Sequence, residues 1–286
     1  MRVLILGSNG QLGYDFQNLF DKLSMDNIAT DYKELNIVNK EETEKFFQEH
    51  GRFDVVINCA AYNDVDKAEN DKEKCYLLNS EAPARLAEMS KKMDSIFVTY
   101  STDFVFDGLK NEPYTEEDIP NPLSVYGQSK YMGETNVLKA YEKSYVIRTS
   151  WVFGIANNNF NKQIINWSKT KSELNIVDDQ TSVPTYSKDL AEFSWELIKT
   201  NKFGLYHLTN SGECSKYEQA KYVLEKIGWK GKLGTAKTKD FNLAAKRAEY
   251  TKLSSEKFEK LLGKKIPNWK DAIDRFLEEM KNEGEV

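Results

Sequence analysis

The sequence predicts an α/β protein built on a mostly parallel sheet with helices on both faces. Short runs of strand-forming residues alternate with longer segments of helical periodicity through the first half of the chain. The run Val3–Leu6 is apolar throughout, as expected of a strand buried on both faces. The segment Gln11–Leu23 follows it, with Leu12, Phe16 and Leu19 at helical spacing. This alternation is typical of βαβ units, which make parallel sheets.

The same alternation continues to about Trp151, after which loops lengthen and strand signals become sparser. In the first part we expect strands at Ile28–Thr30, Val55–Ile57, Ile96–Tyr100 and Tyr145–Arg148, and helices at Lys40–His50, Leu77–Lys92 and Tyr126–Tyr141. In the second part we expect helices at Phe160–Lys169 and Lys188–Lys199, strands at Asn175–Val177 and Gly204–Leu208, a solvated helical surface over Lys252–Lys265, and a last helix with the apolar face Trp269, Ala272, Ile273, Phe276, Leu277 and Met280.

Composition excludes several classes of function. The 286 residues suffice for one or two domains, and the net charge of −5 without a basic stripe excludes a nucleic-acid partner. Three cysteines without a CxxC pair, and two histidines far apart (His50 and His207), predict neither a disulfide framework nor a metal site. No apolar run is long enough for a membrane span. We therefore expect a cytoplasmic protein with reduced thiols, no membrane partner and no metal.

A glycine-rich turn follows the first strand. Gly7, Gly10 and Gly13 are spaced GxxGxxG between this strand and an amphipathic helix. In this context glycines let the backbone approach a pyrophosphate, which the free N–H groups of the helix N-terminus then bind. The pattern predicts a Rossmann-type, doubly wound sheet. We expect residues 1–150 to form the dinucleotide-binding domain, with some later segments returning to it, and residues 151–286 to form mainly a smaller α/β substrate domain.

Asp31 ends the second strand, at about the distance where this fold places an acid for the adenosine ribose. A carboxylate there accepts from a free 2′-hydroxyl and repels a 2′-phosphate, so Asp31 favours NADH over NADPH. Lys33 can soften that repulsion, and a simple turn aspartate is the alternative interpretation. After the third strand, Asn58–Ala61 supplies small residues that leave room for a flat ligand or for ordinary close packing.

Tyr126 and Lys130 form a YxxxK motif. Residues four apart share one face of a helix, so the ammonium can lie near the phenol and lower its pKa toward neutrality. The turn Ser101–Asp103 comes after an earlier strand and offers a hydroxyl to a substrate carbonyl. A phenol acid, an ammonium and a hydroxyl donor converge on one carbonyl, and a nicotinamide beside them supplies hydride. A surface i,i+4 pair is the alternative.

Together these motifs resemble the extended short-chain dehydrogenases/reductases. Longer segments resemble the dTDP-4-dehydrorhamnose reductase family within them, over nearly the full length, although the resemblance thins after about Tyr217. The matching segments are Asp64–Glu69, Ser101–Gly108, Tyr126–Lys130, Arg148–Gly154 and Asp178–Thr185. The resemblance implies reduction of the 4-keto group of dTDP-4-dehydro-L-rhamnose by NADH or NADPH, to give dTDP-L-rhamnose.

The resemblance also implies roles for individual residues. Thr102 and Tyr126 would meet the 4-oxygen, Lys130 would hold the nicotinamide ribose and adjust Tyr126, and Asp103 and Trp151 would contact the sugar. The implied cofactor contacts are Gly7, Asn9, Gly10, Gln11, Leu12, Gly13, Asp31, Asn36, Ile37, Ala60, Ala61, Tyr62, Asn63, Tyr100, Tyr126 and Lys130.

Three departures from the family pattern concern the cofactor crevice. Asn36 stands where an aspartate is common, Tyr62-Asn63 where His-Thr can occur, and Cys59 where alanine is common. Some members bind magnesium between subunits, but the glutamates that hold it have no secure match here.

Two alternative functions stay open: a reductase or epimerase of another nucleotide sugar, and a binding subunit like the regulatory subunit of methionine adenosyltransferase. A homodimer is a family-level expectation only.

Overall fold

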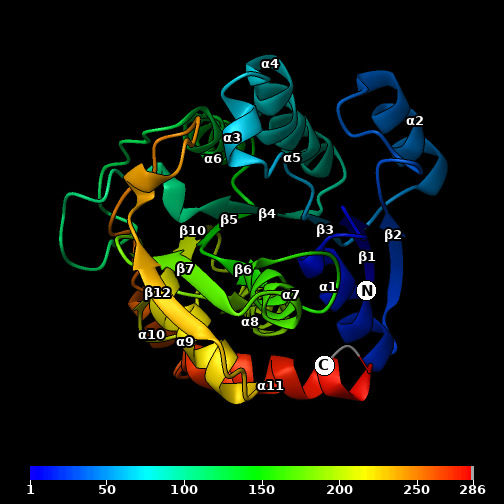
Figure 1. Cartoon of the computed structure of the whole chain (residues 1–286). Coiled ribbons are helices and arrows are strands. Elements are labelled where there is room, and N and C mark those ends of the chain that lie inside the picture. Colours follow the sequence, from blue (N-terminus) through cyan, green and yellow to red (C-terminus); the bar gives the residue numbers. More distant parts are fainter. Residues whose placement is uncertain (285–286) are drawn as a thin grey trace.

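Six parallel strands form the central sheet of this computed structural model, which describes residues 1–284. Their order is β10-β5-β4-β3-β1-β2, so the chain passes from β2 across β1 to β3 (Figure 1). This reversal opens a crevice beyond the carboxyl ends of β1 and β3, as in other doubly wound sheets. The predicted fold class is confirmed. The strands are β1 Arg2–Leu6, β2 Asp26–Thr30, β3 Val55–Asn58, β4 Ile96–Thr102, β5 Ser144–Thr149 and β10 Gly204–His207.

Helices cover both faces of this sheet. Because side chains alternate along a strand, Val3 and Ile5 of β1 pack toward one helical layer, and Leu4 and Leu6 toward the other. The first layer contains α1 Gln11–Lys22, α8 Ser187–Lys199 and α10 Glu256–Leu262. The second layer contains α2 Lys40–His50, α5 Ala82–Lys92 and α6 Val125–Ala140 (Figure 1).

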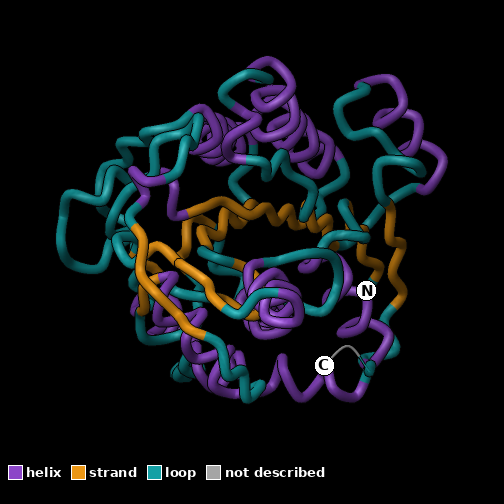
Figure 2. Tube along the Cα trace, viewed as in Figure 1, coloured by secondary structure: helices purple, strands orange, loops and turns teal. Residues whose placement is uncertain are grey.

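Residues after β5 build a further unit with its own core. Three two-stranded sheets pair β7 Glu173–Val177 with β12 Lys232–Ala236, β6 Val152–Phe153 with β9 Thr185–Tyr186, and β8 Thr181–Ser182 with β11 Cys214–Ser215. Between them run α7 Phe160–Thr170, α9 Lys216–Lys226 and α11 Trp269–Asn282, which Figure 2 draws in purple in the same view. The predicted apolar face of α11 is buried throughout, from Trp269 to Met280. Strand β10 returns from this part of the chain to the central sheet, beside β5.

Several elements differ from the sequence prediction. The Ser101-Thr102 pair belongs to β4, and only Asp103 begins the following 3-10 turn, Asp103–Val105. The predicted helix Leu77–Lys92 opens with a π-helical turn, Leu77–Glu81. The predicted helical surface Lys252–Lys265 is helical only over α10.

Three helices were not predicted from the periodicity. Two of them, α3 Val65–Ala68 and α4 Lys72–Tyr76, are too short to show a helical period. The third, α9, carries a capping box of Ser215 and Glu218, which was a readable start signal. A 3-10 turn at Thr238–Asp240 was also not predicted. Among the described helices, none combines the length and the apolar character that crossing a membrane requires.

Candidate active site

The glycine turn is fixed by backbone packing. Gly7 has φ +77°, and a Cβ there would lie 2.6 Å from the amide nitrogen of Ala60, at the end of β3. A Cβ on Gly13 would lie 2.3 Å from the carbonyl oxygen of Gly7. Both positions therefore exclude larger residues. The turn holds the N-terminus of α1 against the carboxyl ends of β1 and β3, where its N–H groups can receive a phosphate.

A cavity of about 340 Å³ lies beside this turn. Three buried polar atoms on or near its wall have no hydrogen-bond partner among residues 1–284: Gln11 Oε1, Ser101 Oγ and Thr149 Oγ1. Buried polar groups are rarely left unpaired, so these atoms mark places where a polar ligand fits. The glycine cradle and the unpaired atoms together suit a dinucleotide.

Asp31 lies against the glycine turn, as its position after β2 predicts. Its Oδ2 accepts a hydrogen bond of 2.9 Å from the backbone N–H of Asn9, and its Oδ1 accepts one of 2.7 Å from Tyr32 N–H. Nearby, Glu34 Oε2 accepts from the Asp31 N–H at 3.0 Å. Two carboxylates thus border the turn, an arrangement that disfavours a further phosphate there.

The predicted catalytic residues come from two neighbouring elements. Thr102 ends β4, whereas Tyr126 and Lys130 lie one turn apart on α6. Ser124 caps α6 by accepting from Gly127 N–H. A Cβ on Gly127 would lie 2.3 Å from the Phe104 carbonyl oxygen, so this glycine lets α6 approach the end of β4 closely.

The Lys130 ammonium donates a 2.6 Å hydrogen bond to the Tyr100 carbonyl oxygen on β4. Burial lowers the pKa of Lys130 to about 8, and the charge of Glu134 acts in the opposite direction. Burial raises the pKa of Tyr126, opposed by the hydroxyl of Thr102. The lowered phenol pKa that we expected from the helix face is therefore wrong for this structure, because desolvation exceeds any effect of Lys130. The phenol is protonated at neutral pH.

Asp103 is buried beneath Thr102, with 1% of its surface exposed. Its carboxylate accepts from the hydroxyls of Thr102 (3.1 Å), Ser182 (2.9 Å) and Thr251 (2.5 Å). Burial raises the pKa of Asp103, while these three donors lower it. The Thr102 oxygen also accepts from Phe104 N–H. Because a hydroxyl has one proton and two lone pairs, Thr102 here gives its proton to Asp103, and its second lone pair is within hydrogen-bond reach of the Tyr126 hydroxyl.

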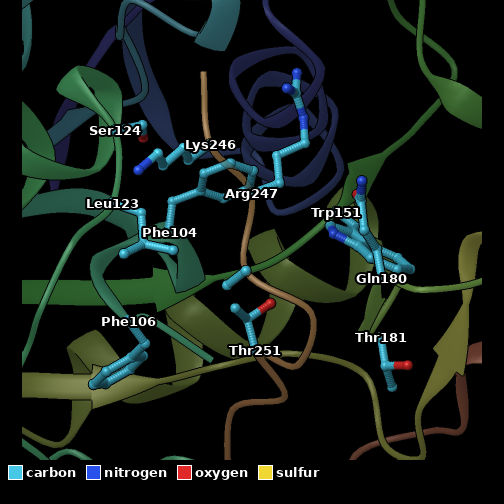
Figure 3. Close-up of a pocket in the computed structure, with 11 residues that line it drawn as sticks. Phe104, Phe106, Leu123, Ser124, Trp151, Gln180, Thr181, Lys246, Arg247 and Thr251 are labelled. Carbon is cyan, nitrogen blue, oxygen red and sulfur yellow. The ribbon is translucent and has the colours of Figure 1, made fainter. Parts of the chain in front are cut away.

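Trp151 follows β5 and joins two cavities. It lines the cavity of the glycine turn and also a second, smaller one (Figure 3). In Figure 3, Trp151, Gln180 and Thr181 lie on one side of the second cavity, and Phe104 and Phe106 lie on the other. Trp151 has φ +43°, a left-handed conformation that is rare for a bulky residue. Such strain is concentrated at functional sites.

The wall of the second cavity includes a cationic segment from far along the chain. Lys246 and Arg247 both line it (Figure 3). The Arg247 guanidinium forms a bidentate ion pair with the carboxylate of Asp66 on α3. The same carboxylate also accepts a 3.0 Å hydrogen bond from Ala245 N–H. The contact with Arg247 lowers the pKa of Asp66. Asp66 therefore anchors the segment around Arg247 over the mouth of the site.

The first cavity brings most of the predicted residues together. Those that line it are Gly10, Gln11, Leu12, Gly13, Ala60, Ala61, Asn63, Tyr100, Thr102, Asp103, Tyr126, Lys130 and Trp151. Six others lie outside its wall: Gly7, Asn9, Asp31, Asn36, Ile37 and Tyr62. Among these six, Ile37 packs its side chain in the core, and Asn36 accepts from Val38 N–H. Tyr62 N–H donates to Asn79 at 2.8 Å.

Other lining residues were not assigned individual contacts from the sequence, although Asn58 and Cys59 belong to the small-residue segment expected there and Ser101 to the predicted hydroxyl turn. Asn58, Cys59, Ser101 and Thr149 lie at strand ends, a position that marks the crevice in this fold. By contrast, Leu190 of α8 and Arg247 reach the cavities from distant segments that carry no local signal. Within residues 1–284, no group of three or more histidine, cysteine or acidic side chains is placed to hold a metal ion.

Comparison with known proteins identifies the family. The model of the RmlD substrate binding domain matches residues 1–282. The spore coat polysaccharide biosynthesis protein SpsK of Bacillus subtilis is 34% identical over 278 residues, which make up 97% of each chain. A dTDP-4-dehydrorhamnose reductase of Clostridium acetobutylicum has a TM-score of 0.95 and 36% identity, covering 98% of this chain and 100% of that one. The Bacillus anthracis enzyme of that name, in complex with NADP, has a TM-score of 0.93 and 36% identity over 97% and 99% of the two chains. The chain therefore belongs to the RmlD family of dTDP-4-dehydrorhamnose reductases.

Proposed function

We propose that this protein is an oxidoreductase that reduces the 4-keto group of dTDP-4-dehydro-L-rhamnose to give dTDP-L-rhamnose, with NADH or NADPH as the reductant. One observation carries the proposal: Thr102, Tyr126 and Lys130 line the same cavity as the glycine turn. A proton donor and a phosphate cradle in one cavity are what a nicotinamide-dependent carbonyl reduction requires.

Gly10, Gln11, Leu12 and Gly13 would hold the pyrophosphate of the cofactor, and Asp31 would take a ribose hydroxyl. The unpaired Thr149 hydroxyl offers a further polar contact in the crevice. The reduced nicotinamide, when bound, supplies the hydride. The acidic border formed by Asp31 and Glu34 favours NADH, because a 2′-phosphate would meet two carboxylates.

Tyr126 would give its proton to the 4-oxygen of the sugar as negative charge develops there. Reduction needs a phenol that carries its proton, and burial keeps Tyr126 in that state. Lys130, held by the Tyr100 carbonyl, places a positive charge on the same face of α6. That charge would stabilise the phenolate left after proton transfer and would bind the nicotinamide ribose.

The second cavity would take the anionic part of the substrate. Lys246 and Arg247 line it, and because Arg247 is already ion-paired with Asp66, Lys246 would supply the charge that attracts a phosphate. Trp151 would cover the sugar where the two cavities meet, and Asp103 would contact the sugar or orient Thr102 toward it. In this account residues 1–150 and β10 hold the dinucleotide, and later segments mainly hold the sugar nucleotide. We place the reaction in the cytoplasm.

A turnover assay tests the proposal. The purified protein is mixed with NADH or NADPH and dTDP-4-dehydro-L-rhamnose, and both cofactor oxidation and sugar products are followed. We expect one cofactor oxidised per dTDP-L-rhamnose formed. An epimerised product without net cofactor oxidation would indicate an epimerase. Binding of the nucleotide sugar without any conversion would indicate a binding subunit, and either result would contradict the proposal.

A further inference from the structure

Lys216 lies at the N-terminus of a helix, where a lysine is electrostatically unfavourable. It is the first residue of α9, directly after the Ser215 cap. Helix N-termini carry partial positive charge, which repels an ammonium. Among residues 1–284, the Lys216 side chain makes no hydrogen bond or ion pair, unlike Lys221 on the same helix, whose ammonium lies 3.9 Å from a Glu225 carboxylate oxygen. The charge of the buried Asp103 offsets part of this cost, but among the described residues no carboxylate pairs directly with the ammonium, so the position calls for a reason other than helix stability.

The contacts of the Lys216 ammonium are aromatic. Its Nζ lies 3.5 Å from the centroid of the Trp151 ring and 4.5 Å from the centroid of the Phe160 ring. A cation over the face of an indole is attracted by the negative face of the ring, more strongly where water is excluded. The ammonium is therefore held between two rings, and one of them borders both cavities of the site.

The orientation of Trp151 needs such support. Its backbone is in the left-handed region, with φ +43°, and its side chain is half-buried rather than locked in the core. A strained conformation persists only when its surroundings fix it. The Trp151 carbonyl oxygen accepts from Thr185 N–H at 3.3 Å, which holds the backbone, and the half-buried indole packs along the core of the second unit. The Lys216 ammonium contacts the indole itself.

We propose that Lys216 is a positioning residue for substrate binding, whose ammonium holds the Trp151 indole in the orientation that covers the sugar. This inference rests on the proposed function, in which Trp151 contacts the nucleotide sugar. The effect of Lys216 is carried by its charge, since an apolar side chain of the same length would fill the space without the attraction to the ring.

The charge of Lys216 can be removed by pH as well as by mutation. Burial lowers the pKa of Lys216 to about 7, whereas Cys214 of β11 and Asp103 beside β4 raise it. The two rings that face the ammonium, Trp151 and Phe160, do not titrate. The side chain therefore loses its charge progressively as pH rises through about 7, and the contact weakens with it.

Binding and kinetics of matched variants test the inference. Lys216→Met removes the charge and keeps the apolar stem, Lys216→Arg keeps the charge, and Lys221→Met is the control on the exposed face of α9. Calorimetry gives the Kd of dTDP-L-rhamnose, and steady-state rates give KM and kcat between pH 6 and 8.5. Thermal melting confirms that each variant is folded.

At pH 6, we expect Lys216→Met to raise Kd and KM roughly 2- to 30-fold, the range of a cation–π contact, with kcat within about threefold. Lys221→Met and Lys216→Arg should match the wild type. The wild-type Kd should rise toward that of Lys216→Met by pH 8.5, and the Kd of Lys216→Arg should stay flat. Equal Kd values for wild type and Lys216→Met at pH 6, or a Lys216→Arg curve that follows the wild type, would overturn the inference.

A double-mutant cycle with Trp151→Leu adds a direct test. If Lys216 acts through the indole, Lys216→Met should change Kd less than about twofold in the Trp151→Leu background. An equal effect in both backgrounds would contradict a positioning role. A wild-type protein that neither binds dTDP-L-rhamnose nor turns over the substrate would instead defeat the proposed function, so the two failures are distinguishable.

Discussion

The two walls of the site are built in different ways. On the cofactor side, the glycine turn follows β1, and Asn58 and Thr102 end the adjacent parallel strands β3 and β4, so all three lie at one edge of the sheet. On the substrate side, Trp151, Gln180 and Arg247 arrive from segments far apart in the chain. Contacts such as the Asp66–Arg247 ion pair, across 181 positions, hold that side together. Sheet topology therefore specifies the cofactor wall, and individual long-range contacts specify the substrate wall.

Substitution of Tyr126 should have the largest effect, because the two walls meet at this residue. Tyr126→Phe keeps the ring against Phe104 but removes the proton donor. We expect kcat to fall roughly 100- to 10,000-fold, the usual contribution of general acid catalysis, with cofactor affinity nearly intact. Steady-state kinetics and a cofactor titration measure both. Turnover close to wild type would refute the role of Tyr126.

Lys130→Met should disturb the cofactor wall. Loss of a charged hydrogen-bond donor should weaken cofactor binding roughly 10- to 100-fold. Since burial lowers the pKa of Lys130 to about 8, the ammonium is charged below pH 8 and neutral above it. The wild-type rate should therefore fall above pH 8, and Lys130→Met should lack that decline. The same pH profile and the same cofactor Kd in both proteins would contradict this assignment.

Trp151→Ala should disturb the substrate wall alone. We expect KM for the nucleotide sugar to rise about 30-fold, as at a binding hot spot, with cofactor affinity and the melting temperature almost unchanged. The indole is only partly buried, so its removal leaves a small cavity. If the variant melts at a much lower temperature but turns over normally below that temperature, Trp151 serves packing and is not part of the substrate wall.

Asp31→Ala should give the smallest change, at the far end of the cofactor wall. Removing the carboxylate that accepts from Asn9 N–H should improve NADPH binding relative to NADH about tenfold. The ratio of kcat/KM values for the two cofactors measures this. A wild type that strongly prefers NADPH would mean that Lys33 dominates the charge near the ribose.

The cofactor wall could be predicted from the sequence because its signals are local. A glycine turn after a strand, an acid after the next strand and a YxxxK motif on a helix each fix geometry within a few residues. Even so, the pKa of Tyr126 was predicted in the wrong direction, because burial depends on the whole fold. The hydrogen bonds from the Ser182 and Thr251 hydroxyls to Asp103 could not be predicted either, because these partners lie 79 and 148 positions away in the sequence.

The substrate wall could be predicted only in part. Trp151 was found because it directly follows a strand and because its motif resembles a family. Arg247 lies in a loop and carries no local pattern, whereas Lys216 begins a helix whose capping box was readable but was not recognised. Their roles depend on contacts with Asp66 and Trp151, which only the folded chain brings within reach.

The central claim is that this site transfers a hydride to C4 of the sugar while Tyr126 protonates the 4-oxygen. The most direct measurement uses a reduced cofactor with deuterium at the transferable position of its nicotinamide, and locates the label in the product by NMR. We predict deuterium at C4 of dTDP-L-rhamnose, formed at a rate that Tyr126→Phe lowers at least 100-fold. Hydrogen at C4 derived from solvent, label at another carbon, or no labelled product would contradict the account.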